Sequence, residues 1–259
     1  MKIAVCVKEV PDAGPSRRID PTTLRMDRSG DRSLNVYDLN AVEEGIRLRD
    51  AAGEGEVVLV SLGASRALES LRKGLAMGAD RAVLVSDEAA VGSDLVATSH
   101  VLAEALKAES PDVVLFGQQA SDGDGAVLWA AVADRLRMPV ISQISELTVE
   151  GGTATAKRQT EFGYDTIAAP LPVVLAVADS LNEPRYPSLK GIMGAKKKPQ
   201  ETKSLADIVV DPGAAGESGS RTTVVALSDP PSRGDTIKIE DDGSGAQKIF
   251  DFLVERKLI

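Results

Sequence analysis

The sequence predicts an α/β fold built on a parallel sheet. Up to Pro139, short apolar runs rich in β-branched residues alternate with longer segments whose apolar residues recur at helical spacing. Strands of a parallel sheet have this nearly continuous apolar character because crossover helices cover both faces of the sheet. The chain has 259 residues, which is enough for one large or two small domains and a sizeable core.

The elements before Pro139 follow from these runs in order. The apolar runs are expected to form strands at residues 2–8, 56–62, 81–86 and 112–117. The segments with helical spacing are expected to form helices at residues 35–50, 65–77, 94–108 and 126–136. In the first helix, Glu43 and Glu44 are expected to point outward. Gly78 is expected to end the second helix, because glycine tolerates the left-handed conformation common at helix C-termini.

The pattern changes after Pro139. Residues 147–158 alternate around Glu150-Gly151-Gly152 and predict a β-hairpin, and residues 165–169 and 172–179 continue as strands. Residues 182–198 are expected to be irregular. Residues 211–220 are rich in glycine, alanine and serine and predict a linker. Residues 245–257 predict an amphipathic helix, which needs a partner subunit or the chain's own core to lie on.

Composition excludes several classes of function. The chain has 30 lysines and arginines against 39 aspartates and glutamates, a net charge of −9, which argues against nucleic-acid binding. One cysteine, Cys6, and one histidine, His100, exclude an internal disulfide and cysteine-rich or multi-histidine metal sites. No apolar run approaches the roughly 20 residues that span a bilayer, and the start shows no cleavable signal peptide. A cytoplasmic chain with no membrane insertion is therefore expected.

The most informative local motif is the segment 117–126, Gly-Gln-Gln-Ala-Ser-Asp-Gly-Asp-Gly-Ala. It follows a predicted strand and opens a predicted helix. Glycine lets the backbone approach a ligand, and a helix N-terminus offers free N–H groups and partial positive charge, a combination that binds phosphate. The alternative is an ordinary turn with an aspartate N-cap. The chain has neither GxxxxGK[ST] nor GxGxxG, so an ATP-hydrolysing P-loop and the standard dinucleotide motif are both unsupported.

Other chemically reactive residues have simpler interpretations. Cys6 lies inside a predicted strand and is interpreted as a buried apolar side chain, and His100 as a surface or core histidine. The chain has no Gly-x-Ser-x-Gly motif, which argues against a serine hydrolase. Lys196–Lys198 are interpreted as a solvated charge run, or as an attractor of phosphate or an acidic partner. Leu189 either packs on its own domain or is an exposed anchor for a pocket on another protein.

Taken together, these residues resemble the β subunit of electron transfer flavoproteins. Residues 182–198, NEPRYPSLKGIMGAKKK, carry the most specific likeness, to the family's NEPRY…L…IM.AKKK segment. Residues 74–81, GLAMGADR, resemble the family's ALAMGADRA segment. Val5–Asp12, Ala41–Glu44 and the segment 117–126 match in the same order. The resemblance covers nearly the whole chain.

The resemblance implies a Rossmann-like adenine-nucleotide-binding domain at residues 1–205, which includes the hairpin and a partner-recognition loop at 182–198. A linker and C-terminal helix at 206–259 would then wrap an α subunit. The heterodimer would share one FAD, held mostly by the α subunit, and the β subunit would bury a structural AMP. It would carry electrons from flavin dehydrogenases, such as the acyl-CoA dehydrogenases of fatty acid β-oxidation, to a membrane-bound quinone oxidoreductase. The β chain would be a carrier without a catalytic acid or base, rather than an enzyme.

The resemblance also assigns site residues by position. Those expected to line the nucleotide are Cys6, Asn35, Val36, Tyr37, Asp38, Leu62, Gly117, Gln119, Ala120, Asp122, Gly123, Asp124, Gly125, Ala126, Val127 and Leu128. Among them, Tyr37 matches the position of an aromatic residue near the flavin ring. Leu189 matches the exposed anchor of the recognition loop, and the other expected recognition residues are Arg185, Tyr186, Ile192 and Met193.

Two departures from the family pattern and two alternatives remain. Many members carry Gln-Thr-Gly where this chain has Val127-Leu128-Trp129, so phosphate binding would rest on backbone N–H groups near Gly123, Gly125 and Ala126. Residues 158–165 also depart from the family pattern. One branch of the family bifurcates electrons and binds a second FAD in place of AMP, although the form of residues 182–198 favours the single-FAD carrier. A stand-alone adenine-nucleotide-binding protein could share the fold, whereas a nucleotide-dependent enzyme would need a catalytic constellation that the sequence does not show.

Overall fold

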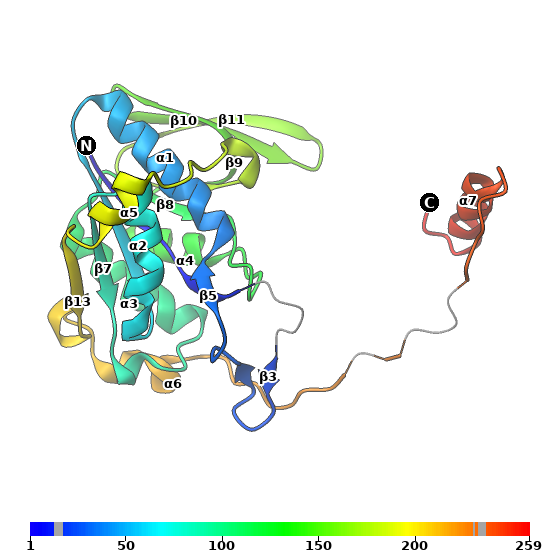
Figure 1. Cartoon of the computed structure of the whole chain (residues 1–259), viewed down its shortest axis with the longest axis horizontal. Helices are drawn as coiled ribbons and strands as arrows, with labels where there is room; N and C mark the ends of the chain where they lie inside the picture. Colours follow the sequence, from blue (N-terminus) through cyan, green and yellow to red (C-terminus); the bar gives the residue numbers. More distant parts are fainter. Residues whose placement is uncertain (13–17, 230, 233–236) are drawn as a thin grey trace. The chain divides into compact units, whose positions relative to one another are not determined.

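A computed structural model describes residues 1–12, 18–229, 231–232 and 237–259. The chain divides into two compact units, Met1–Val224 and Val225–Ile259. The first unit is a mixed α/β domain with a nine-stranded, mostly parallel sheet between layers of helices (Figure 1). Residues 206–224, which the sequence grouped with the C-terminal extension, lie in this first unit.

The strand order of the main sheet is β11-β10-β9-β12-β8-β1-β6-β7-β13. Its parallel part comprises β1 (Lys2–Cys6), β6 (Glu56–Leu62), β7 (Arg81–Val85), β8 (Val113–Gly117), β12 (Val173–Val177) and β13 (Gln200–Lys203). The antiparallel part comprises β9 (Val140–Glu150), β10 (Thr153–Thr160) and β11 (Gly163–Pro170). β9 also pairs in parallel with β12 and joins the two parts. The predicted parallel strands are confirmed to within two residues, and the predicted hairpin is confirmed, although its first strand begins earlier, at Val140.

Alternate side chains of the strands point to opposite faces of the sheet, and helices cover each face. Ile3 and Val5 of β1 pack in the apolar cluster that contains the buried residues of α1 (Val36–Ala52) and α2 (Leu68–Met77). Ala4 and Cys6 point the other way, into the cluster formed with α3 (Leu95–Glu109) and α4 (Leu128–Leu136). Successive side chains of a strand point to opposite faces, so a continuous apolar run requires helices on both sides.

The remaining elements are short. Two pairs of small strands lie between β1 and α1: β2 (Glu9–Pro11) with β5 (Arg32–Leu34), and β3 (Ile19–Asp20) with β4 (Arg25–Met26). The 3₁₀ turns are η1 (Ser65–Ala67), η2 (Glu88–Ala90), η3 (Asp179–Leu181), η4 (Ala206–Ile208) and η5 (Pro212–Ala214). The short helices are α5 (Leu189–Ala195) and α6 (Gly216–Gly219), and the second unit contains α7 (Gly245–Glu255). Gly78 ends α2 with a φ of 140°, as expected for a glycine C-cap.

Four expectations about local structure are wrong. Residues 182–198 are not wholly irregular, because they contain α5. The helix expected at 126–136 begins at Leu128. Residues 211–220 are not a free linker, because they form η5 and α6 and bury Ala215. Glu43 and Glu44 do not point outward, since both are buried. For α5, residues 211–220 and the two glutamates, contacts with distant parts of the chain decide the local structure.

Candidate functional site

A cavity of about 660 Å³ opens at the carboxyl ends of the central strands. Cys6, Leu62 and Gly117, the last residues of β1, β6 and β8, line it, together with Ser86, which follows β7. The chain runs from β1 outward to β6 and β7 and then returns to β8 on the other side of β1. In open α/β sheets, ligands bind at the carboxyl edge where the strand order reverses in this way. The cavity is therefore where the fold favours a ligand.

Most of the residues expected to line a nucleotide lie along this cavity. They are Cys6, Asn35, Asp38, Leu62, Gly117, Gln119, Ala120, Gly123, Gly125, Ala126, Val127 and Leu128. Val36, Tyr37, Asp122 and Asp124 are not part of the lining. Val36 is exposed at the first turn of α1, and the Tyr37 hydroxyl lies 3.5 Å from Gln119 Nε2. Asp124 Oδ1 lies 3.4 Å from the same Gln119 nitrogen.

The loop between β8 and α4 is held by hydrogen bonds from two side chains. The buried Asn35 donates from Nδ2 to the Gln119 carbonyl at 2.8 Å and accepts from the Ser121 N–H at 3.0 Å. Trp129 donates from its indole nitrogen to the Gln118 carbonyl at 3.1 Å. Asn35 therefore acts by shaping the loop as well as by lining the cavity.

Gly117 is where the loop leaves the sheet, and only glycine fits there. A Cβ at this position would lie 2.5 Å from the Tyr37 carbonyl carbon and 2.6 Å from Asp38 Oδ1. Asp38 is buried and accepts the Lys8 N–H at 2.8 Å. Burial raises the pKa of the Asp38 carboxyl to about 7, although hydrogen bonds from Asn35 and the Lys8 N–H oppose this change. The start of α1 is thus packed directly against the floor of the cavity.

Asp122, within this loop, is the centre of an ion-pair cluster. Its carboxylate accepts from Lys8 Nζ at 2.8 Å and from Arg28 Nη2 at 2.5 Å. Burial would raise the pKa of Asp122, but hydrogen bonds from Lys8 and Arg28 and their charges lower it. Both cations line the cavity, and the sequence reasoning missed both. Lys8 could have been found from its place at the end of a predicted strand, whereas nothing local marks Arg28.

The start of α4 offers backbone donors to the cavity. In the described part of the chain, the N–H groups of Gly125, Ala126 and Val127 donate to no protein acceptor. Val127, the N-cap residue, contributes no side-chain cap. All three residues line the cavity, and a Cβ on Gly125 would meet nothing within 4 Å. Unpaired N–H groups at a helix N-terminus suit an anionic group such as phosphate.

In the described part of the chain, neither Cys6 nor His100 belongs to a nucleophile–base pair. Burial and the nearby Asp38 charge raise the pKa of the Cys6 thiol well above its ordinary value, so it stays protonated. His100 is not a lining residue, and its Nδ1 lies 3.9 Å from Glu104 Oε1. Among the described residues, no group of three or more histidine, cysteine, aspartate or glutamate side chains could hold a metal ion.

The segment 182–198 presents an apolar surface to solvent. Tyr186 is 93% exposed, Leu189 81%, Met193 71% and Ile192 52%. Leu189, Ile192 and Met193 are spaced i, i+3 and i+4 on α5 and therefore share one face of the helix. Ser188 caps this helix, since its Oγ accepts the Gly191 N–H at 3.0 Å. Arg185 does not join the apolar surface, because its guanidinium pairs with Glu43.

The fold is an open α/β domain with a cavity at the carboxyl ends of its central strands, and comparison with known proteins gives its family. The model of the electron transfer flavoprotein domain matches residues 23–208. The chain is 36% identical over 263 residues to electron transfer flavoprotein subunit beta of Mycobacterium tuberculosis, covering 99% of both chains. It is 38% identical over 271 residues to the subunit beta of Megasphaera elsdenii, covering 100% of both. It is 42% identical over 236 residues to the caffeyl-CoA reductase-Etf complex subunit CarD of Acetobacterium woodii, covering 90% of both.

The chain therefore belongs to the electron transfer flavoprotein beta-subunit family, as its sequence motifs predict. Members of this family are electron carriers and not catalytic enzymes. In the described residues, no helix is long and apolar enough to cross a membrane.

Proposed function

We propose that this chain pairs with an electron transfer flavoprotein α subunit and that the heterodimer shares one FAD, held mostly by the α subunit. The FAD supplies the redox chemistry, and the heterodimer carries electrons from flavin dehydrogenases such as acyl-CoA dehydrogenases to a quinone oxidoreductase. Family membership supports the carrier role. The observation that carries the docking role is the apolar face of α5, whose Leu189 is 81% exposed. A leucine that only packed on its own domain would be covered.

We further propose that the cavity binds AMP as a structural nucleotide. The free N–H groups of Gly125, Ala126 and Val127 would hold the phosphate. Lys8 and Arg28 would add positive charge at the cavity wall, while Asp122 keeps both side chains in place. The bound nucleotide would tie the loop after β8 to the ends of β1 and β6, and so stabilise the subunit.

A second candidate for the same cavity is a second FAD, with electron bifurcation as the function. The observation that favours it is the 42% identity to a subunit of the caffeyl-CoA reductase-Etf complex, which is of the bifurcating type. The two ligands share the adenosine and one phosphate, so the loop after β8 would serve both.

The C-terminal extension is proposed to pack on the α subunit. The extension was expected to begin at residue 206, whereas the second compact unit begins at Val225. Helix α7 carries Ile249, Phe250 and Val254 with roughly half of each side chain exposed. An apolar helix face of this kind is stabilised when a partner covers it.

Ligand analysis of the co-expressed heterodimer tests these assignments. The complex is purified, denatured, and its released FAD and AMP are quantified. One FAD and one AMP per heterodimer would support the single-FAD carrier. Two FAD and no AMP would favour the bifurcating candidate, and a complex without flavin would refute both.

Substitution of Leu189 tests the docking role separately. An apolar anchor at the centre of an interface contributes about 2 kcal/mol, so Leu189→Ala should raise the KM of a dehydrogenase for the carrier by about 30-fold. Flavin content should not change. Val209→Ala shortens another strongly exposed apolar side chain, outside the segment, and serves as the control. Unchanged kinetics with every dehydrogenase that reduces the wild-type heterodimer would remove the anchor role.

A further inference from the structure

We propose that Glu43, Gly191 and Lys198 are positioning residues that fix the segment 182–198 on helices α1 and α2 in the conformation that docks a flavin dehydrogenase. This inference rests on the proposed docking role of the segment. It adds that the apolar face is preorganised, because contacts within this chain hold the segment near both ends and at its middle.

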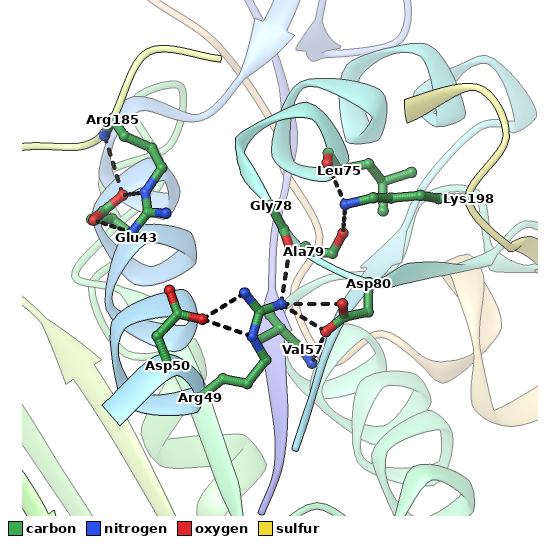
Figure 2. Close-up of polar contacts among 10 residues, drawn as sticks. All are labelled: Glu43, Arg49, Asp50, Val57, Leu75, Gly78, Ala79, Asp80, Arg185 and Lys198. Carbon is green, nitrogen blue, oxygen red and sulfur yellow. Dashed lines mark hydrogen bonds and ion pairs between the residues drawn. The ribbon is translucent and has the colours of Figure 1, made fainter. Parts of the chain in front are cut away.

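The first attachment is a two-point ion pair near the N-terminal end of the segment. Arg185 donates from Nε to Glu43 Oε2 at 2.7 Å and from Nη2 to Glu43 Oε1 at 2.9 Å (Figure 2). The Arg185 backbone N–H also donates to Glu43 Oε2 at 3.2 Å. The Glu43 side chain is only 8% exposed. A bidentate arginine–carboxylate pair fixes direction as well as distance, so the backbone at Arg185 is tied to α1.

Neighbouring amide contacts extend this attachment by one turn of α1. Asn40 donates from Nδ2 to the Asn182 carbonyl at 2.8 Å. Asn182 donates from its own Nδ2 to the Asn40 carbonyl at 3.1 Å and to Glu44 Oε2 at 3.0 Å. The two acidic residues of α1 that sequence reasoning expected to face solvent therefore hold the start of the segment.

The second attachment is at the C-terminal end. Lys198 donates from Nζ to the Leu75 carbonyl at 2.9 Å and to the Ala79 carbonyl at 2.5 Å (Figure 2). Leu75 lies in the last turn of α2, where carbonyls lack partners within the helix and where the helix dipole favours a cation. Lys196 and Lys197 are exposed, so only the third lysine of the run has this role.

The carbonyls that receive Lys198 lie in the last turn of α2 and just after it, and α1 also holds the residues that follow this helix. Arg49 of α1 donates from Nη1 to the Gly78 carbonyl at 3.0 Å and to Asp80 Oδ2 at 3.0 Å. Asp80 Oδ2 in turn accepts the Val57 N–H of β6 at 2.8 Å. Glu43 of α1 holds the first attachment directly. The second is held through the end of α2, which contacts Arg49 of α1 and the sheet (Figure 2).

Gly191 fixes the middle of the segment. A Cβ on Gly191 would lie 2.3 Å from the Ala76 carbonyl oxygen, so α5 approaches the backbone of α2 more closely than any other residue would allow. The side chains of Leu189, Ile192 and Met193 remain exposed. An anchor surface held rigidly before docking loses less conformational entropy when it binds.

The test compares two variants with two matched controls in the co-expressed heterodimer. Glu43→Gln removes the charge of the first attachment, and Lys198→Met removes the donors of the second. Glu69→Gln and Lys73→Met change the same residue types at exposed positions of α2. The donor is an acyl-CoA dehydrogenase that reduces the wild-type heterodimer, and hydrogen exchange is followed over residues 186–195.

Both attachment variants should speed exchange in residues 186–195, whereas the controls should not. If the docking conformation falls to about a fifth of the population, the KM for the carrier rises about fivefold while kcat is unchanged. Normal exchange and a normal KM in both variants would overturn the inference. A lower melting temperature without either effect would overturn it as well, because it would leave only a structural role.

A double-mutant cycle with Leu189→Ala separates this inference from the proposed function. If Glu43 acts through the presentation of Leu189, Glu43→Gln should change KM much less in the Leu189→Ala background than in the wild type. Effects that multiply independently would refute the positioning role. If Leu189→Ala alone has no effect, the proposed docking function fails, and the present inference fails with it even where exchange shows that the attachments exist.

Discussion

Gly117→Ala is expected to destabilise the domain, because the position has no room for a methyl group. The new Cβ would lie 2.5 Å from the Tyr37 carbonyl carbon and 2.6 Å from both the Tyr37 carbonyl oxygen and Asp38 Oδ1. Reaching an ordinary carbon–carbon contact of about 3.5 Å would require a movement of about 1 Å between the end of β8 and the first turn of α1. Two backbones cannot separate by rotating a side chain, so the cost should lie at the upper end of the overpacking range, about 3 kcal/mol.

Gly30→Ala is the matched control for this change. Gly30 lies outside the cavity lining, its φ is not positive, and a Cβ there would meet nothing within 4 Å. A glycine-to-alanine change at such a position should be stabilising by about 0.5 kcal/mol, because it reduces the entropy of the unfolded chain. The two substitutions make the same chemical change, but their effects on the free energy of unfolding should have opposite signs.

Calorimetric melting of the heterodimer measures the difference. At about 2–4 °C per kcal/mol for a domain of this size, Gly117→Ala should lower the melting temperature by about 8 °C and Gly30→Ala should leave it unchanged or slightly raised. Nucleotide content should fall in Gly117→Ala alone, because the cavity floor moves. A melting temperature for Gly117→Ala within 1 °C of that for Gly30→Ala, on the order of the measurement error, would refute the steric argument.

Two buried carboxylates should give opposite pH dependences of stability. Burial would raise the pKa of Glu109, but hydrogen bonds and charges from Arg81 and Lys2 lower it from 4.5 to about 2. The contribution of this carboxylate to stability is therefore present above pH 4.5 and is lost as pH falls toward 2. Denaturant titrations should therefore show an acid-dependent loss of about 3 kcal/mol in the wild type that Glu109→Gln lacks. Burial raises the pKa of Asp38 from 3.8 to about 7, so its contribution is present below pH 3.8 and is lost as pH rises toward 7. Asp38→Asn should flatten this part of the stability curve, and an unchanged slope between pH 4 and 7 would show that the carboxyl does not titrate there.

The sequence predicts the sheet well because its strands are defined locally. The strand at 56–62 is found at the predicted residues, and the hairpin turn lies at Gly151 and Gly152, which both have positive φ. A buried parallel strand needs apolar residues on both faces, so its composition alone identifies it. The glycine-rich segment after β8 is likewise local, since it combines a strand end, turn residues and a helix start within a dozen positions.

Helix α5 could not be predicted in the same way. Its seven residues include Gly191 and Gly194, and Pro184 and Pro187 precede it, so its intrinsic helix propensity is low. It forms because Gly191 allows a close approach to α2, a contact between residues far apart in sequence. The start of the helix at Leu128 was missed for a different, local reason: Asp124 and Ala126 adopt positive φ, with values of 45° and 44°, and delay the first turn.

Buried acidic residues mark the limit of what local pattern can reveal in this chain. Sequence reasoning expected Glu43 to face solvent and Asp122 to line the nucleotide. Glu43 pairs with Arg185 and Asp122 pairs with Lys8 and Arg28, partners 142, 114 and 94 positions away. Burying a carboxylate is unfavourable unless a cation and hydrogen bonds compensate for the lost water. The same carboxylates are therefore evidence of long-range contacts once the structure is known: one ties the segment 182–198 to α1, and the other holds two cations at the cavity wall. A helical carboxylate next to an apolar stripe thus has two possible environments, and only the tertiary fold decides between them.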